Sequence, residues 1–189
     1  MEWRSAINEM GSAIAVRFPA TLIFLIGFML PVEAQAQGAG CVMQSAGAPT
    51  RQVLVCRDGL VIEAEAGADY TLLDRNRDGR PDAARLQGRA LYIDVQPRSR
   101  GSNFQVLTPQ AIAAVRGTQW AVDVADGKTS VFVVAGRVTV RRSNAPTSVN
   151  LGPGEGVDVE TGPAPLTVRR WPIARANALL ARFGRQIRQ

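Results

Sequence analysis

The sequence contains no histidine, and Lys128 is its only lysine, so nearly all of the formal net charge of +6 comes from arginine. Without histidine, the chain lacks the most common general base and the most common ligand for transition metals. Aromatic residues make up only 6% of the chain. A surface on which nucleic-acid bases stack has aromatic residues interleaved with basic ones, and here the aromatic residues are not interleaved with the scattered arginines. We therefore expect neither an enzyme nor a nucleic-acid-binding protein.

Glutamate and lysine, both good helix formers, are scarce, whereas valine, glycine and threonine are common. This composition favours an all-β body. Short alternating segments follow one another about every ten residues, a spacing that is typical of a sandwich, a barrel or a short β-solenoid. We predict such a body of short antiparallel strands over residues 37–161, with segments at 60–64, 70–73, 86–95 and 104–108.

The first 36 residues have the layout of a secretory signal peptide. Arg4 and Arg17 precede an apolar run at residues 20–30, and Ala34 and Ala36 supply the small residues that a signal peptidase requires. The run is shorter than the roughly 20 residues that span a bilayer as a helix. We expect cleavage after Ala36 and a periplasmic or secreted protein; an uncleaved membrane anchor is the alternative.

The two cysteines, Cys41 and Cys56, bracket a segment with a predicted bend at residues 47–49. A hairpin would bring their sulfur atoms together across neighbouring strands, and an oxidising compartment outside the cytoplasm would favour the bond. We therefore predict a disulfide between them. The alternative is that Cys41, preceded by Ala39 and Gly40, is a lipoprotein acylation site.

The most specific pattern predicts a β-meander between residues 113 and 143. An Asp-Gly pair between two alternating strands is a strong hairpin signal, because both central residues of a type I′ turn need a positive φ. Further glycines follow, at position 136 and in a Gly-Glu-Gly turn. In order, the series is an Arg-Gly-Thr triplet at 116–118, a strand at 119–125, the turn at 126–127, a strand at 129–135, Gly136, a strand at 137–142 and the turn at 154–156.

This ordered series, together with the segment FQVLTPQA at residues 104–111, resembles the FecR domain of bacterial envelope regulators. The resemblance implies a two-layered all-β unit, and it identifies Arg116, Gly117, Thr118 and Gly136 as the family motif. FecR regulators join a cytoplasmic segment that controls a sigma factor to a periplasmic domain that senses an outer-membrane transporter. This sequence resembles only the periplasmic portion, and we expect no sigma-binding segment ahead of the signal peptide.

The resemblance therefore implies an exported regulatory module that acts through contacts with an envelope or membrane-bound protein, without transfer of anti-sigma activity. Within the motif, Arg116 has two interpretations. It is either a binding residue for a carboxylate of the partner, or a buried or half-buried residue that satisfies loop carbonyls and fixes the turn before Gly117. We expect the structural role.

Residues 74–82 follow the D-x-N-x-D-G-x-x-D pattern of calcium loops. Alternate oxygen-bearing side chains converge on one cation, and glycine at the sixth position permits the sharp reversal. Arg85 stands where a bidentate glutamate would complete the shell. The alternative is a turn in which the aspartates bind their own backbone. The candidate Ca²⁺ ligands are the side chains of Asp74, Asn76, Asp78 and Asp82 and the carbonyl of Arg80; occupied, this loop would suit a structural envelope or secreted protein.

The tail, residues 162–189, begins with a Pro-rich link and continues as a predicted amphipathic helix from Trp171 to Ile187. Leu180, Phe183 and Ile187 share a face, and arginines lie mostly elsewhere. One interpretation is a basic helix that lies on anionic lipid. The other, which we expect, is a cap that covers apolar edges at the open end of the β-stack.

Overall fold

The fold was analysed in a computed structural model, which describes residues 40–96 and 103–187. The expected signal peptide and its cleavage point after Ala36 lie outside the described residues. Within the two described ranges, no helix combines the length and the apolar character that crossing a bilayer demands.

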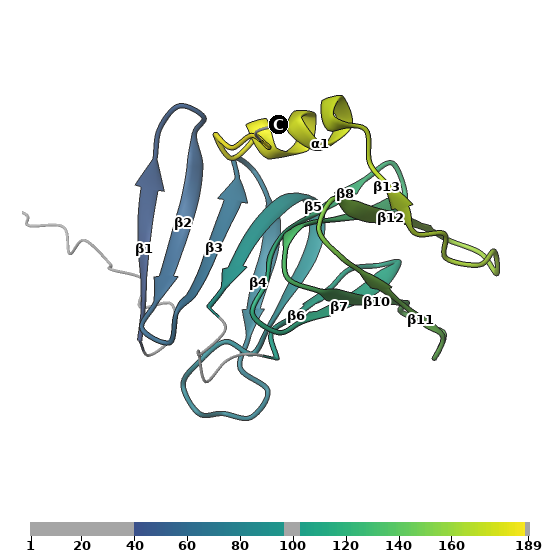
Figure 1. Ribbon diagram of the computed structural model, residues 1–189. Helices are drawn as coiled ribbons and strands as arrows, with labels where there is room; N and C mark the ends of the chain where they lie inside the picture. The colour runs from purple at the N-terminus through teal and green to yellow at the C-terminus, as the bar shows by residue number, and fades with distance from the viewer. Residues whose placement is uncertain (1–39, 97–102, 188–189) are drawn as a thin grey trace, which may run out of the picture. The chain divides into compact units, whose positions relative to one another are not determined.

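The described residues form an all-β body with one short helix near the C-terminus, which confirms the predicted fold class (Figure 1). The elements are β1 (Cys41–Ala46), β2 (Arg51–Cys56), β3 (Leu60–Glu65), β4 (Asp69–Leu73), β5 (Ala83–Val95), β6 (Gln105–Leu107), β7 (Ala111–Val115), β8 (Gln119–Ala125), β9 (Lys128–Ala135), β10 (Val138–Arg142), β11 (Ser148–Leu151), β12 (Glu155–Glu160), β13 (Arg169–Arg170) and α1 (Ile173–Ala181).

The long strand β5 joins two layers into one curled sheet. Its first half pairs with β4 and β6, and its second half pairs with β3 and β8. Arg89, with a φ of +64°, lies between the two halves. Sheet A runs in the order β1-β2-β3-β5-β8-β9-β12-β13, and sheet B in the order β4-β5-β6-β7-β10-β11. The pairing of β5 with β6 is parallel, whereas the other pairings are antiparallel.

Two details of the expected pairing are wrong. The third strand of the predicted meander, β10, pairs with β7 and β11 in sheet B and does not continue from β9. The segment at 153–156 is likewise expected to join its two flanking strands in a hairpin, but β11 pairs with β10 while β12 pairs with β9 in sheet A. At both points the chain crosses from one layer to the other, and alternation along a strand does not specify its neighbour.

The main core lies between the two layers. Alternation along β8 points Trp120 and Val122 inward, where they meet Leu91, Ile93 and Val140 with essentially no solvent exposure. The residues between them, such as Ala121, point to the opposite face of sheet A. That face carries a second apolar cluster, which α1 covers. The tail therefore packs on a sheet face and not, as expected, on the open end of the stack.

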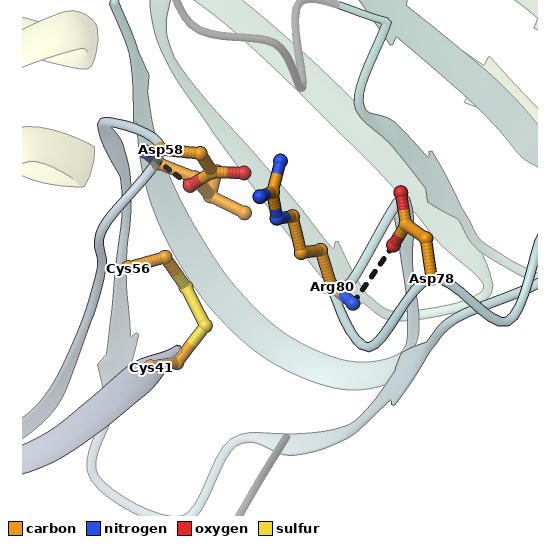
Figure 2. Close-up of a disulfide and its surroundings, with 6 residues drawn as sticks. Cys41, Cys56, Asp58, Asp78 and Arg80 are labelled. Atoms are coloured by element: carbon orange, nitrogen blue, oxygen red, sulfur yellow. Dashed lines mark hydrogen bonds between the residues drawn. A yellow bond between two sulfur atoms is a disulfide. The ribbon is translucent and has the colours of Figure 1, made fainter. Parts of the chain in front are cut away.

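The disulfide prediction is confirmed. β1 and β2 form a hairpin in which Cys41 lies opposite Cys56, and their sulfur atoms are bonded (Figure 2). A cysteine sulfur in a disulfide cannot carry a lipid thioether at the same time. The bond therefore ties together the two strands at one edge of sheet A.

Replacing both cysteines by alanine (C41A/C56A) is expected to lower the free energy of unfolding. The bond spans 15 residues of sequence, and closing a loop of that size in the unfolded chain stabilises a protein by about 3 kcal/mol in the chain-entropy model. Urea denaturation of the variant measures this loss. Wild-type protein under reducing conditions should lose a similar amount, and unchanged stability in both would contradict the prediction.

Candidate functional site

The Arg-Gly-Thr turn before β8 packs directly against the glycine turn between β9 and β10. The buried hydroxyl of Thr118 lies 3.2 Å from the carbonyl oxygen of Arg116 and 3.0 Å from that of Arg137, and it accepts a hydrogen bond of 3.3 Å from the Arg137 N–H. One side chain thus links the two turns through their backbones. The turn that begins β8 is held beside the crossing from sheet A to sheet B.

Both glycines of this motif adopt the left-handed backbone region, with φ of +61° at Gly117 and +86° at Gly136. A methyl group at position 136 would lie 2.6 Å from the carbonyl oxygen of Gly117 and 2.9 Å from Oγ1 of Thr118. The two backbones therefore approach as closely as glycine alone permits. Three of the four motif residues act together in this contact.

Arg116 does not have the buried or half-buried position that we expected. Its side chain is exposed, and within the described ranges only its backbone carbonyl contacts the motif, through the Thr118 hydroxyl. The turn is fixed by Thr118 and the two glycines, so the guanidinium is not needed to satisfy loop carbonyls. Its exposure leaves it available to a partner.

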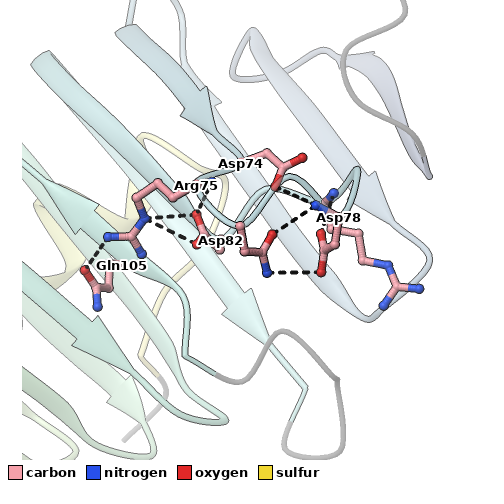
Figure 3. A network of polar contacts seen from close by, with 7 residues as sticks. Asp74, Arg75, Asp78, Asp82 and Gln105 are labelled. Atoms are coloured by element: carbon pink, nitrogen blue, oxygen red, sulfur yellow. Dashed lines mark hydrogen bonds and ion pairs between the residues drawn. The ribbon is translucent and has the colours of Figure 1, made fainter.

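In the loop at residues 74–82, side-chain oxygens bind the loop's own backbone (Figure 3). Asp74 accepts hydrogen bonds from the N–H groups of Asp78, at 3.1 Å, and Gly79, at 2.8 Å. Asn76 also accepts a bond from the Asp78 N–H, and Asp78 accepts one from the Arg80 N–H. Asp74, Asn76 and Asp78 are thus brought together in a tight turn, as the alternative interpretation predicts.

The fifth candidate ligand, Asp82, is turned toward Arg75. It accepts hydrogen bonds from the backbone N–H and from Nε of Arg75, at 3.2 and 3.1 Å, and the same guanidinium reaches Gln105. Within residues 40–96 and 103–187, no group of three or more His, Cys, Asp or Glu residues is arranged to hold a metal ion. Calcium binding by this loop stays a prediction.

A neighbouring aspartate, Asp58, lies on the same hollow of about 590 Å³ as the loop. Its Oδ1 accepts a hydrogen bond from the Leu60 N–H at 3.2 Å, whereas its Oδ2 is buried and has no hydrogen-bond partner among the described residues. Figure 2 shows the Arg80 side chain extending toward Asp58. The calcium-loop pattern does not include Asp58, because this residue lies 16 residues before the loop.

The helix α1 buries its apolar side against the outer face of sheet A. Leu179, Leu180 and Phe183 pack on Tyr92 and Phe132, and the ring of Trp171 stacks on Phe132 with 5.1 Å between centroids. These are the side chains that a lipid-bound helix would insert. The packing supports the cap interpretation, and lipid contact stays a prediction that vesicle co-sedimentation can test.

Two arginines just after the C-terminal end of α1 pair with carboxylates on the same face of sheet A. Arg182 binds Glu65 and Asp123, and Arg185 binds Glu63. Burial lowers the pKa of Arg182 and Arg185, but hydrogen bonds to these carboxylates outweigh it and raise both pKa values. The sequence showed the arginines, but only pairing of distant strands placed the carboxylates beneath them.

Asp158 anchors the N-terminal end of the helix. Its Oδ1 accepts hydrogen bonds of 2.6 Å from Arg175 and from Ser130, and Arg175 lies 3.6 Å from the centroid of the Trp171 ring. Burial raises the pKa of Asp158, but the two hydrogen bonds and the charges of Arg175 and Lys128 bring it below its ordinary value of 3.8. The ionised form is therefore the one that the fold stabilises.

Asp158→Asn is expected to remove a pH-dependent contribution to stability. Because the pKa of Asp158 is lower in the folded protein, this contribution is present above the ordinary pKa of the group and disappears as the pH falls through the folded value. The carboxylate is 34% exposed, so we expect no more than about 1 kcal/mol at neutral pH. Urea denaturation at about pH 7 and about pH 3 measures it, with D69N as an exposed control. A difference that did not shrink as the pH fell from about 7 to about 3 would contradict the assignment.

A model of the FecR protein family matches residues 45–139, which is 95 of the 189 residues. The chain belongs to the FecR family. The matched range contains the Arg-Gly-Thr motif and Gly136, so the resemblance inferred from the sequence is confirmed. No curated protein matches the chain significantly.

Two crystal structures of a candidate anti-sigma factor from Parabacteroides distasonis ATCC 8503 share the fold of this FecR protein. They were determined at 2.50 and 1.65 Å resolution, and each is 21% identical to it in sequence. The TM-scores are 0.56 and 0.55, and the similarity covers 74% of this chain. The chain spans 64% of the length of these neighbours.

Three valines on β1, β2 and β3 form an apolar row that no pattern in the sequence indicated. Val42 is 60% exposed and Val55 is 38% exposed. They lie opposite each other on β1 and β2, and Val61 lies opposite Val55 on β3. We call Val42, Val55 and Val61 the valine row. The pairing of neighbouring strands, and not the spacing of the valines along the chain, brings them together.

Proposed function

We propose that this protein is an exported, non-enzymatic regulatory module that binds a protein partner in the bacterial envelope. Its membership of the FecR family carries the proposal. Such a module works through its surface, and α1 already covers the outer face of sheet A between β3 and β12. A partner therefore binds one of the surfaces that α1 does not cover, and the exposed Arg116 lies on one of them.

Arg116 is a suitable contact for an acidic partner, because a planar guanidinium binds a carboxylate through two parallel hydrogen bonds. The Thr118 and Gly136 contacts hold its backbone in place, so the side chain projects from a fixed turn. Because the backbone of Arg116 is already fixed, less conformational entropy is lost when its side chain binds a partner. The proposed role is recognition of a carboxylate on the partner.

Affinity capture from envelope extract tests this proposal, with wild-type protein, R116E and R57E as baits. Arg57 is a matched control, because it is also exposed and lies at a turn. We expect a stoichiometric envelope protein on the wild-type and R57E baits, and at least tenfold less of it on R116E at an equal melting temperature. Equal recovery on all three baits would remove Arg116 from the binding surface, and recovery only with peptidoglycan would contradict the regulatory proposal.

A second candidate function is structural, with calcium stabilising an envelope or secreted protein. The unpartnered Oδ2 of Asp58 beside the 74–82 loop favours it, because a buried carboxylate oxygen without a donor is costly unless a cation or water satisfies it. The side chains of Asp74, Asn76, Asp78 and Asp82 and the carbonyl of Arg80 would complete the ligand set, with Asp82 turning from Arg75 toward the cation.

Calorimetric titration with CaCl₂ tests this candidate on wild-type protein, D78A/D82A and the exposed control D69N. We expect an affinity of about 0.1–1 mM, typical of extracellular modules, that the double variant loses and D69N retains. No heat at millimolar calcium, or equal heat in D78A/D82A, would exclude the site.

A further inference from the structure

The four edge strands of the two sheets differ in how well they are protected against pairing with another strand. Native proteins protect such edges with charge, shortness, proline or irregular pairing. In sheet A, β13 consists of two arginines. In sheet B, β11 has four residues, and β4 begins with Asp69 and pairs irregularly with β5. Each of these three edges carries at least one protective feature.

The remaining edge, β1, has none of these features. Its six residues, CVMQSA, include no charge and no proline, and they pair with β2 in continuous register from Cys41 to Ala46. Among residues 40–96 and 103–187, β2 is the only strand that β1 pairs with. The disulfide fixes this hairpin. β1 is therefore a stable, open template for one more strand.

The valine row lies at this same edge. Two of the three large apolar side chains that are most exposed in the described chain, Val42 and Val55, belong to it. Contiguous exposed apolar residues mark interaction sites, whereas single ones do not. An added strand would cover the open side of Val42.

We propose that β1 pairs with β1 of a second copy of this protein, antiparallel and centred on Val42. A two-fold axis at Val42 places it opposite the second copy's Val42, with Cys41 opposite Met43 and Gly40 opposite Gln44. The two valine rows then become one continuous row across both molecules. Residues that lie opposite each other in an antiparallel pair have Cβ atoms about 4.5–5.5 Å apart, so the two Val42 side chains touch.

The charge distribution favours a second copy as the occupant. Two identical strands meet across a two-fold axis only if each is compatible with itself, and β1 brings no like charges together. The nearest arginine on the hairpin, Arg51, is paired with Glu63 at 2.7 Å. This inference goes beyond the proposed function, and it holds or fails independently of envelope partners.

Sedimentation velocity of V42D, V42K and their equimolar mixture tests the pairing, because charges at position 42 face each other only across the proposed axis. Wild-type protein is expected to form a weak dimer over about 5 to 500 µM, since a contact of one strand is small. V42D and V42K alone should each dimerise at least tenfold more weakly, through repulsion of like charges. The mixture should regain dimer, because Asp then faces Lys.

I173D is the matched control, because Ile173 is also exposed, at 46%, but lies on α1. It should dimerise like the wild type. A wild-type protein that is monomeric throughout, or a mixture that stays as monomeric as its components, would overturn the proposal. So would V42D and V42K proteins that each dimerise as well as the wild type, since position 42 would then lie away from the contact.

Discussion

Phe183→Ala is expected to lower the free energy of unfolding by about 3–5 kcal/mol, the cost of truncating a fully buried phenylalanine. Phe183 is 1% exposed and packs in the apolar cluster between α1 and sheet A. Its ring lies 5.9 Å from that of Tyr92, centroid to centroid. The truncation leaves a cavity beside β5, a strand that belongs to both layers. Urea denaturation followed by tryptophan fluorescence measures the loss.

Ile173→Ala is the control for this prediction. Ile173 lies on the same helix but is 46% exposed, so its truncation should cost far less, within about 0.5–1 kcal/mol. If F183A and I173A were equally stable, α1 would not be part of the folded core. The interpretation of the tail as a lipid-binding helix would then regain support.

Gly136→Ala is expected to destabilise the protein by about 2–4 kcal/mol, since two costs add. The first is strain, because an alanine at a φ of +86° occupies a conformation that side chains disfavour. The second is overlap, because the new methyl group meets the Gly117 carbonyl and the Thr118 hydroxyl. Relief of the overlap would separate the two turns that Thr118 links. Thermal and urea denaturation measure the combined effect.

Gly127→Ala separates these two costs. Gly127 has a similar φ of +70°, but a methyl group there would meet nothing within 4 Å. Its substitution should therefore cost only the conformational strain, about 1–2 kcal/mol. The excess in G136A over G127A measures the contact between the turns. If the two variants lost equal stability, Gly136 would be required only for its positive φ and not for the contact between the turns.

Local features were predictable from the sequence because they depend on near neighbours. Alternation at 119–125 predicts a strand whose bounds the structure reproduces, and the Asp126-Gly127 turn joins it to β9. The bend between Cys41 and Cys56 predicts the hairpin and the disulfide. The candidate site was predictable in part: the Arg-Gly-Thr motif was found, but the burial of Arg116 was wrong, because exposure depends on what packs against a residue.

The sequence by itself therefore determined most of the strands, though not β7 or β13, and it determined the disulfide and the family, since these rest on local patterns along the chain. Only the tertiary structure decided which strands pair, and that β10 and β11 belong to one layer and β12 to the other. It also decided that Arg182 and Arg185, just after α1, pair with Glu63, Glu65 and Asp123. The physical reason is that an alternating strand offers the same backbone hydrogen bonds to any neighbour. Burial of both layers around Trp120 and Leu91 selects one arrangement, and that selection also leaves β1 and the valine row at an open edge.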